Sequence, residues 1–124
     1  MKHTYSDGAF TWDVKDLWKA AEGIEPVSMP IRYVLNIEQF LDSHSWSAGK
    51  MSVREILDHA DRIDNADLSY PILLTPDGYV ADGCHRIVRA LKEGRDSILV
   101  IKLPAMPKAK MNNDGCNHFH LEYL

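Results

Sequence analysis

The sequence predicts an α+β fold of the broader α/β class, in which a small mixed sheet is flanked by helices in one domain spanning residues 1–124. Consecutive stretches predict it: a hairpin pattern over residues 70–81, a helical pattern over 84–93 and a β-branched run over 97–103. A helix between two strands is the usual connection that returns the chain to a parallel neighbour. We therefore expect these stretches to form one packed unit with the helix that begins near Ser52.

Composition limits the class of protein. The chain is 45% hydrophobic and 26% charged, as an ordinary globular domain is, so we expect a packed core. A formal net charge of −4 argues against a nonspecific DNA-binding surface, and nucleic acid is not the expected partner. No apolar run approaches transmembrane length and the start is too polar for a secretory signal, so we expect a cytoplasmic protein with no membrane partner. Cys84 and Cys116 are then expected to be free thiols.

The N-terminal region predicts an arm and a helix. Residues 1–8 are polar, and we expect a flexible arm there. Apolar residues then recur at helical spacing before Gly23, which predicts a short amphipathic helix. These residues are Val14, Leu17, Trp18 and Ala21. Trp12 and Trp18 either line a ligand or partner surface or form a buried stripe, which is the commoner use of aromatic residues at such spacing.

The next stretch is less regular. Residues 25–35 contain prolines followed by a β-branched-rich run, which predicts an extended entry strand with a proline near its start. Residues 37–41 predict a helical turn. Residues 43–49 have loop composition and could act as a mobile flap, in which we expect His44 and Trp46 to be exposed.

Ser52 and Glu55 have the spacing of a capping box, so they predict the start of a helix. Its expected apolar stripe consists of Ile56, Leu57, Ala60 and Ile63. The other side is expected to be solvated, and it carries Arg54, Asp58, His59, Asp61 and Arg62.

The turn between the hairpin and the following helix combines residues with chemical potential. Asp82 and Gly83 precede Cys84, His85 and Arg86, which occupy the first helical turn. Backbone N–H groups there have no intrahelical partner and the helix dipole is positive, so a phosphate or carboxylate could bind. Gly83 would let a ligand approach the backbone. The positive end of the helix dipole, together with Arg86 and a protonated His85, would lower the pKa of Cys84.

A simpler interpretation of this turn also fits the spacing. Asp82 would then be an N-cap, Cys84 a small core residue and Arg86 a solvated side chain. The pattern of residues leaves both interpretations open.

Residues 71–103 resemble the core of the ParB/sulfiredoxin superfamily, in which a G-x-x-R turn opens a helix over a nucleotide phosphate. The motif from Gly83 to Arg86, G-C-H-R, is similar to the sulfiredoxin form, whose Cys is the nucleophile and whose His and Arg contact ATP. With Asp82 in place of a sulfiredoxin Gly, D-G-x-H-R also resembles ParB-like proteins that lack the Cys. The resemblance implies nucleotide contacts from Gly83, His85 and Arg86, and from the start of the helix near Ser52. Candidates there are Lys50, Ser52 and Arg54.

Two classes of function are compatible with this resemblance. The first is an enzyme that binds ATP or another nucleotide with Mg²⁺ and transfers a phosphoryl group or hydrolyses a phosphodiester. Its candidate catalytic residues are Asp82, as metal ligand or base, and Cys84, as nucleophile in a sulfiredoxin-type sulfinic acid reductase. The second is a non-catalytic nucleotide-binding or protein-interaction module, for which the acidic charge and the aromatic N-terminal helix are hints.

The end of the sequence predicts one more strand. Residues 118–124 alternate strictly between polar and apolar types, so we expect a terminal strand. Cys116, His118 and His120 are metal-ligand types, but alternation along one strand is an uncommon zinc arrangement. We therefore predict outward-facing polar residues and no protein metal site.

Overall fold

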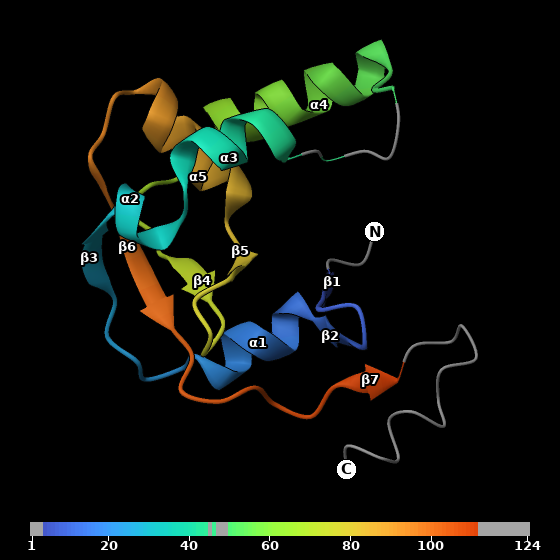
Figure 1. Ribbon diagram of the computed structural model, residues 1–124, viewed down its shortest axis with the longest axis vertical. Coiled ribbons are helices and arrows are strands. Elements are labelled where there is room, and N and C mark those ends of the chain that lie inside the picture. The colour runs from blue at the N-terminus through green and yellow to red at the C-terminus, as the bar shows by residue number, and fades with distance from the viewer. Residues whose placement is uncertain (1–3, 45, 47–49, 112–124) are drawn as a thin grey trace.

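The computed structural model describes residues 4–44, 46 and 50–111, which form the two sheets and five helices of Figure 1. One sheet has the order β3-β6-β4-β5, with β3 at Val27–Pro30, β4 at Ile72–Leu74, β5 at Val80–Asp82 and β6 at Ser97–Lys102. Strand β4 is parallel to β6, and the other pairs are antiparallel. The fold is therefore α+β with a mixed sheet, as the sequence predicts.

The predicted hairpin, helix and returning strand are confirmed as β4–β5, α5 (Cys84–Lys92) and β6. The hairpin turn closes through Thr75 N–H donating to the Tyr79 carbonyl at 2.8 Å. Helix α5 ends at Lys92, and Gly94 follows its C-cap with a φ of 72°, which lets Arg95 N–H donate back to the Ala90 carbonyl. The glycine thus ends the helix and turns the chain into β6.

The N-terminal arm prediction is wrong for the described residues. Strand β1 (Thr4–Ser6) pairs antiparallel with β2 (Phe10–Asp13), and β7 (Lys110–Met111) pairs with the other edge of β2. Tyr5 lies opposite Trp12 in this register, with ring centroids 5.9 Å apart. A cross-strand aromatic pair stabilises a short hairpin, and this pair accounts for order that polar composition did not predict.

Of the first three helices, two were predicted. Helix α1 (Val14–Ala20) is confirmed, and the predicted helical turn is extended as α3 (Ile37–Ser43). The predicted entry strand is wrong in its second half, because β3 ends at Pro30 and the chain becomes the short helix α2 (Ile31–Val34). Helical spacing buries both ends of α2 in the core, which local β propensity does not anticipate.

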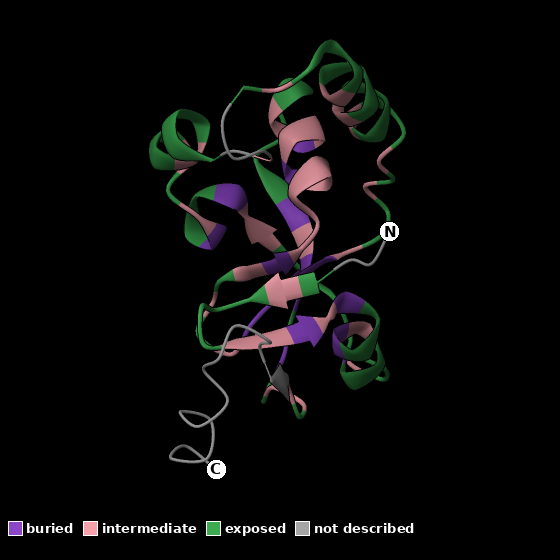
Figure 2. Cartoon of the chain, turned by 90° about the vertical axis from the view of Figure 1, so that its right-hand side faces the viewer, coloured by how far each residue is buried: buried purple, intermediate pink, exposed green. Residues whose placement is uncertain are grey.

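The larger sheet has a hydrophobic cluster on each face, because alternate residues of β4 point to opposite sides. Ile72 packs with α2 and with Ile87 and Ala90 of α5, whereas Leu73 packs with Trp12 and with Leu17 of α1. Figure 2 shows buried residues in the strands and on the helices packed against them, whereas α3 and α4 (Val53–Asp64) have no buried residue. This packing fixes the position of the first turn of α5 over the end of β5.

Helix α4 (Val53–Asp64) begins with the predicted capping box, since Ser52 Oγ accepts from Glu55 N–H at 3.1 Å. The predicted solvated face is confirmed for Arg54, Asp58, Asp61 and Arg62, which are exposed, but the predicted apolar stripe is wrong in part. Ile56 and Leu57 are 52% and 61% exposed, whereas His59 is half-buried. The side of α4 that carries His59 faces α5, where His59 contacts His85.

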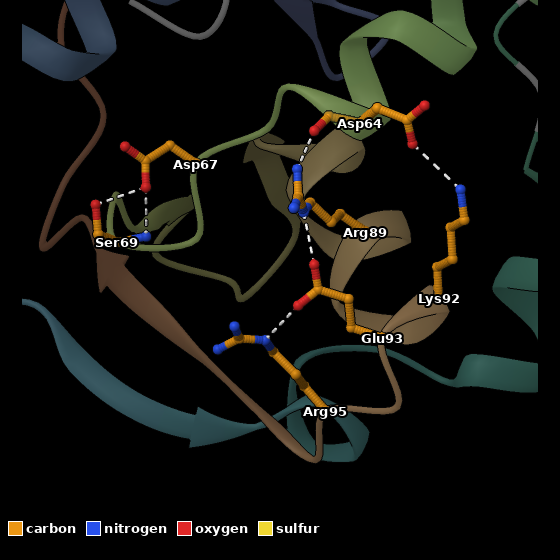
Figure 3. Close-up of polar contacts among 7 residues, drawn as sticks. All are labelled: Asp64, Asp67, Ser69, Arg89, Lys92, Glu93 and Arg95. Carbon is orange, nitrogen blue, oxygen red and sulfur yellow. Dashed lines mark hydrogen bonds and ion pairs between the residues drawn. The ribbon is translucent and has the colours of Figure 1, made fainter.

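Charged side chains join α4 to the C-terminal half of α5 (Figure 3). Arg89 donates to the backbone carbonyl of Asp64 and, at 2.7 Å, to Glu93. Lys92 Nζ lies 3.2 Å from the Asp64 carboxylate, and Arg95 donates to Glu93 at 3.0 Å. These contacts hold the last turn of α4, and with it the loop that follows, against α5.

Several predictions fall outside the described residues. They concern most of the loop at 43–49, the strand at 118–124 and the side chains of Cys116, His118 and His120. Over the part of the chain that the structure covers, no helix is long and apolar enough to cross a membrane.

Candidate functional site

The candidate site is the N-terminus of α5. Gly83 is its N-cap, with φ at 112°, and no side chain caps the helix there. A Cβ at Gly83 would lie 2.6 Å from Ile72 Cγ2, so the missing side chain accommodates Ile72. The glycine therefore allows close packing of α5 on β4, and its role in making room for a ligand stays a prediction.

A cavity of about 530 Å³ opens beside this turn. Gly83, His85 and Arg86 line one side, and the end of α4 with the loop after it lines the other. The residues of that second side include Arg62, Asn65, Asp67 and Tyr70. Arg86 is half-buried, and its Nη1 donates to the Pro71 carbonyl at 3.4 Å. Two arginines, Arg62 and Arg86, therefore line a cavity at an uncapped helix N-terminus, and Arg62 Nη2 lies 3.2 Å from Asp58 Oδ2.

A second cavity of about 460 Å³ lies on the other side of Asp82 and Gly83. Cys84 and His85 line it from α5, and Glu55, Asp58 and His59 line it from α4. Arg62, Asp82, Gly83 and His85 line both cavities. The two cavities therefore share the residues of the D-G-C-H-R motif at Asp82, Gly83 and His85.

Asp82 is not the N-cap of α5. Its Oδ2 accepts a hydrogen bond from Trp18 Nε1 of α1 at 2.7 Å, which fixes the carboxylate at the edge of both cavities. Trp18 is half-buried against the second core cluster, so its indole ring packs in the core and its N–H positions a candidate site residue. The sequence contains both residues, but their pairing depends on the packing of α1 against the sheet.

Cys84 is a half-buried free thiol. Burial raises its pKa above the ordinary value of 9.0, and the negative charge of Asp82 raises it further. This direction is opposite to the expected one, because desolvation and the carboxylate oppose the thiolate. The geometry therefore favours a packing or ligand-lining role for Cys84 over that of a nucleophile.

His85 has an unexpected set of neighbours. His59 Nδ1 lies 2.8 Å from His85 Nε2. The Trp46 ring stacks on both imidazoles, with centroids 4.8 Å from His85 and 4.6 Å from His59. His44 contacts the edge of Trp46, and burial lowers the His44 pKa. We expected His44 and Trp46 to be exposed. His44 is exposed as predicted, whereas Trp46 is half-buried because the two imidazoles provide a flat surface.

The predicted binding residues divide into two groups. Asp82, Gly83, His85 and Arg86 are brought together around the two cavities, with Cys84 on one of them. Lys50, Ser52 and Arg54 do not line either one, and the Ser52 hydroxyl serves as a helix cap. Their role in nucleotide binding stays a prediction. Sequence reasoning missed Arg62, Asp67 and His59. The orientation of α4 places His59 and Arg62 at the site, and the loop after α4 places Asp67 there.

Magnesium ions need few protein ligands when a nucleotide supplies phosphate oxygens. Within the described residues, no group of three or more His, Cys, Asp or Glu side chains is arranged to hold a metal ion. Asp82 is the carboxylate on both cavities, and it would be the protein ligand of a nucleotide-bound Mg²⁺.

No protein-family model, curated protein or solved structure matches this chain.

Proposed function

We propose that this chain is a ParB/sulfiredoxin-like domain that binds the phosphate groups of a nucleotide at the N-terminus of α5. The observation that carries the proposal is that Arg62 and Arg86 line the same 530 Å³ cavity as Gly83, beside a helix end that no side chain caps. First-turn N–H groups and two guanidinium groups favour a polyanion. The D-G-C-H-R sequence at this place is the residue pattern from which the family resemblance comes.

The carboxylates of the cavity indicate how the nucleotide would bind. Asp67 and Asp82 line it together with the arginines, and they would repel a bare phosphate. A divalent cation bound to the phosphates removes this repulsion, so the proposal specifies ATP or another nucleotide as its Mg²⁺ complex. We further propose a cytoplasmic location, where such complexes are abundant.

The catalytic form of this proposal is phosphoryl transfer or phosphodiester hydrolysis. It is favoured by the fixed Asp82 carboxylate, which Trp18 holds beside His85 at the junction of the two cavities. Asp82 would hold the Mg²⁺ or accept a proton from the attacking group. Sulfiredoxin-type chemistry is less well supported, because the raised pKa of Cys84 lowers its thiolate fraction. A non-catalytic module would bind the same ligand without turnover.

The test combines binding and turnover. Thermal shift and calorimetry with ATP, GTP, CTP, UTP and pyrophosphate, each with and without Mg²⁺, should identify a ligand that stabilises the protein. We expect Arg62→Ala and Arg86→Ala to weaken binding, and Arg32→Ala, an exposed arginine on α2, to leave it unchanged. Equal affinity in all four proteins would refute the site. Phosphate release by the wild type, and its loss in Asp82→Asn, would separate the enzyme from the non-catalytic module.

A further inference from the structure

A third cavity, of about 400 Å³, lies away from α5. It is formed between the β1–β2 hairpin and the turn that joins β4 to β5, and it shares no lining residue with the two cavities at Gly83. The nucleotide proposal therefore does not account for it.

Aromatic rings line this cavity from both sides. Tyr5 and Trp12 come from paired positions of β1 and β2, with centroids 5.9 Å apart and planes tilted by 32°. Trp12 is only 7% exposed, and its Nε1 donates to the Pro107 carbonyl at 2.8 Å, which fixes the indole. Tyr79 lines the opposite side and is 66% exposed. The cavity thus combines an ordered ring pair with an accessible third ring.

Among the residues that the structure describes, the charged ones that line this cavity are acidic. They are Asp7, in the turn between β1 and β2, and Asp77, in the β4–β5 turn. Asp7 Oδ1 accepts backbone N–H bonds from Ala9 at 3.0 Å and Phe10 at 2.8 Å, so its position is fixed. The pKa of Tyr5 is raised, first by burial and then by the charge of Asp7. The two carboxylates therefore favour a positive charge in this cavity.

We propose that this cavity binds an organic cation, an alkylated ammonium or a guanidinium group, supplied by a small molecule or by a protein side chain. Faces of aromatic rings attract such cations, and the attraction grows when the cation is partly desolvated. Carboxylates at Asp7 and Asp77 add attraction that a neutral ligand of the same shape would not gain. The apolar rings can also pack against the alkyl groups of an organic cation. A metal ion has no such groups and would not gain this contact. This site is independent of the nucleotide site.

The first test compares a cation with its neutral isostere. The choline cation and 3,3-dimethylbutan-1-ol have the same shape and differ in charge, and methylguanidinium tests the planar alternative. The readout is the NMR shift of the Trp12 indole N–H on titration of the full chain. We expect saturable binding of a cation in the millimolar range, about tenfold tighter than that of the alcohol. Equal affinity for the alcohol, or no saturable shift with either cation, would overturn the proposal.

Variants then locate the binding. Tyr79→Leu keeps an apolar side chain and removes the ring, and Asp77→Asn removes one charge, both at exposed positions. We expect each to weaken cation binding about threefold to tenfold. Tyr33→Leu on α2 and Asp42→Asn on α3 are exposed controls of the same kind, and they should bind as the wild type does. Weakening by the controls as much as by the site variants would exclude the cavity.

A third test asks whether the bound cation belongs to a small molecule or to a protein side chain, by offering the protein one ligand of each kind. A peptide with one trimethyl-lysine and the free choline cation carry the same trimethylammonium group. Tighter binding of the peptide supports a protein side chain as the ligand, and tighter binding of choline supports a small molecule. Loss of both with Tyr79→Leu would confirm that they share this cavity.

Discussion

His59 Nδ1 lies 2.8 Å from His85 Nε2, and the two imidazoles together form the surface on which Trp46 stacks. One nitrogen donates and the other accepts, so the pair holds one proton between these two atoms. The surface beneath Trp46 therefore comes from both α4 and α5, which this hydrogen bond joins.

We expect acidification through pH 6.5 to loosen the contact between His44 and Trp46, because the lowered pKa of His44 favours its neutral ring in the folded state. Its contribution to stability is present above its ordinary pKa of 6.5 and is lost as pH falls through the folded pKa. The measurement is tryptophan fluorescence against pH in the wild type and in Trp46→Leu. A transition that persists in Trp46→Leu would assign it to Trp12 or Trp18 instead.

Gly83→Ala should destabilise the protein by at least about 2 kcal/mol. The new Cβ would meet Ile72 Cγ2 at 2.6 Å, and the φ of 112° is strained for alanine. Gly78→Ala is the matched control, because its φ is 92° but no atom lies within 4 Å of the new Cβ, so we expect a loss of about 1 kcal/mol. Urea unfolding of both variants measures the difference. Equal losses would show that backbone strain alone explains Gly83.

Arg86→Ala should weaken phosphate binding more than folding. A charge-assisted contact to a bound anion contributes about 1.5–3 kcal/mol, whereas the hydrogen bond from Arg86 to Pro71 is long at 3.4 Å. Calorimetry with the nucleotide identified by thermal shift, together with urea unfolding, separates the two effects. Unchanged affinity in a normally folded variant would reject the role of Arg86.

Cys84 should react slowly with iodoacetamide at neutral pH, with a rate that rises only above the ordinary thiol pKa of 9.0. Because the folded state favours the protonated thiol, its contribution to stability is present below that value and is lost as pH rises through the folded pKa. Cys84→Ser should retain nucleotide binding at a stability cost of about 1 kcal/mol. Rapid alkylation that a bound nucleotide prevents, with loss of turnover in Cys84→Ser, would restore the nucleophile hypothesis.

Arg89→Ala should cost about 1 kcal/mol of stability, because Arg89 donates to the carbonyl of Asp64 in the last turn of α4 (Figure 3). Lys92→Ala is the control, since its ion pair with Asp64 is largely exposed and should contribute less than about 0.5 kcal/mol. Thermal unfolding compares the two variants. A larger loss in Lys92→Ala would mean that the ion pair, and not the carbonyl contact, joins the helices.

Local sequence determined the central unit of this fold. The turn at Thr75, the capping box at Ser52 and the terminating Gly94 predict the hairpin, α4 and α5 because each signal acts within a few residues of the chain. The same short range explains why the D-G-C-H-R residues were found together in sequence and remain together in the structure.

Only the tertiary structure decided which face of each element is used. Burial of Ile31 and Val34 made a helix from a β-prone run, and the rotation of α4 brought His59 and Arg62 to the site. Folding also set the environment of Cys84, because desolvation and the charge of Asp82 raise the pKa of its thiol. Such effects depend on groups that are far apart in the chain and meet only through packing, so a pattern of neighbouring residues does not contain them.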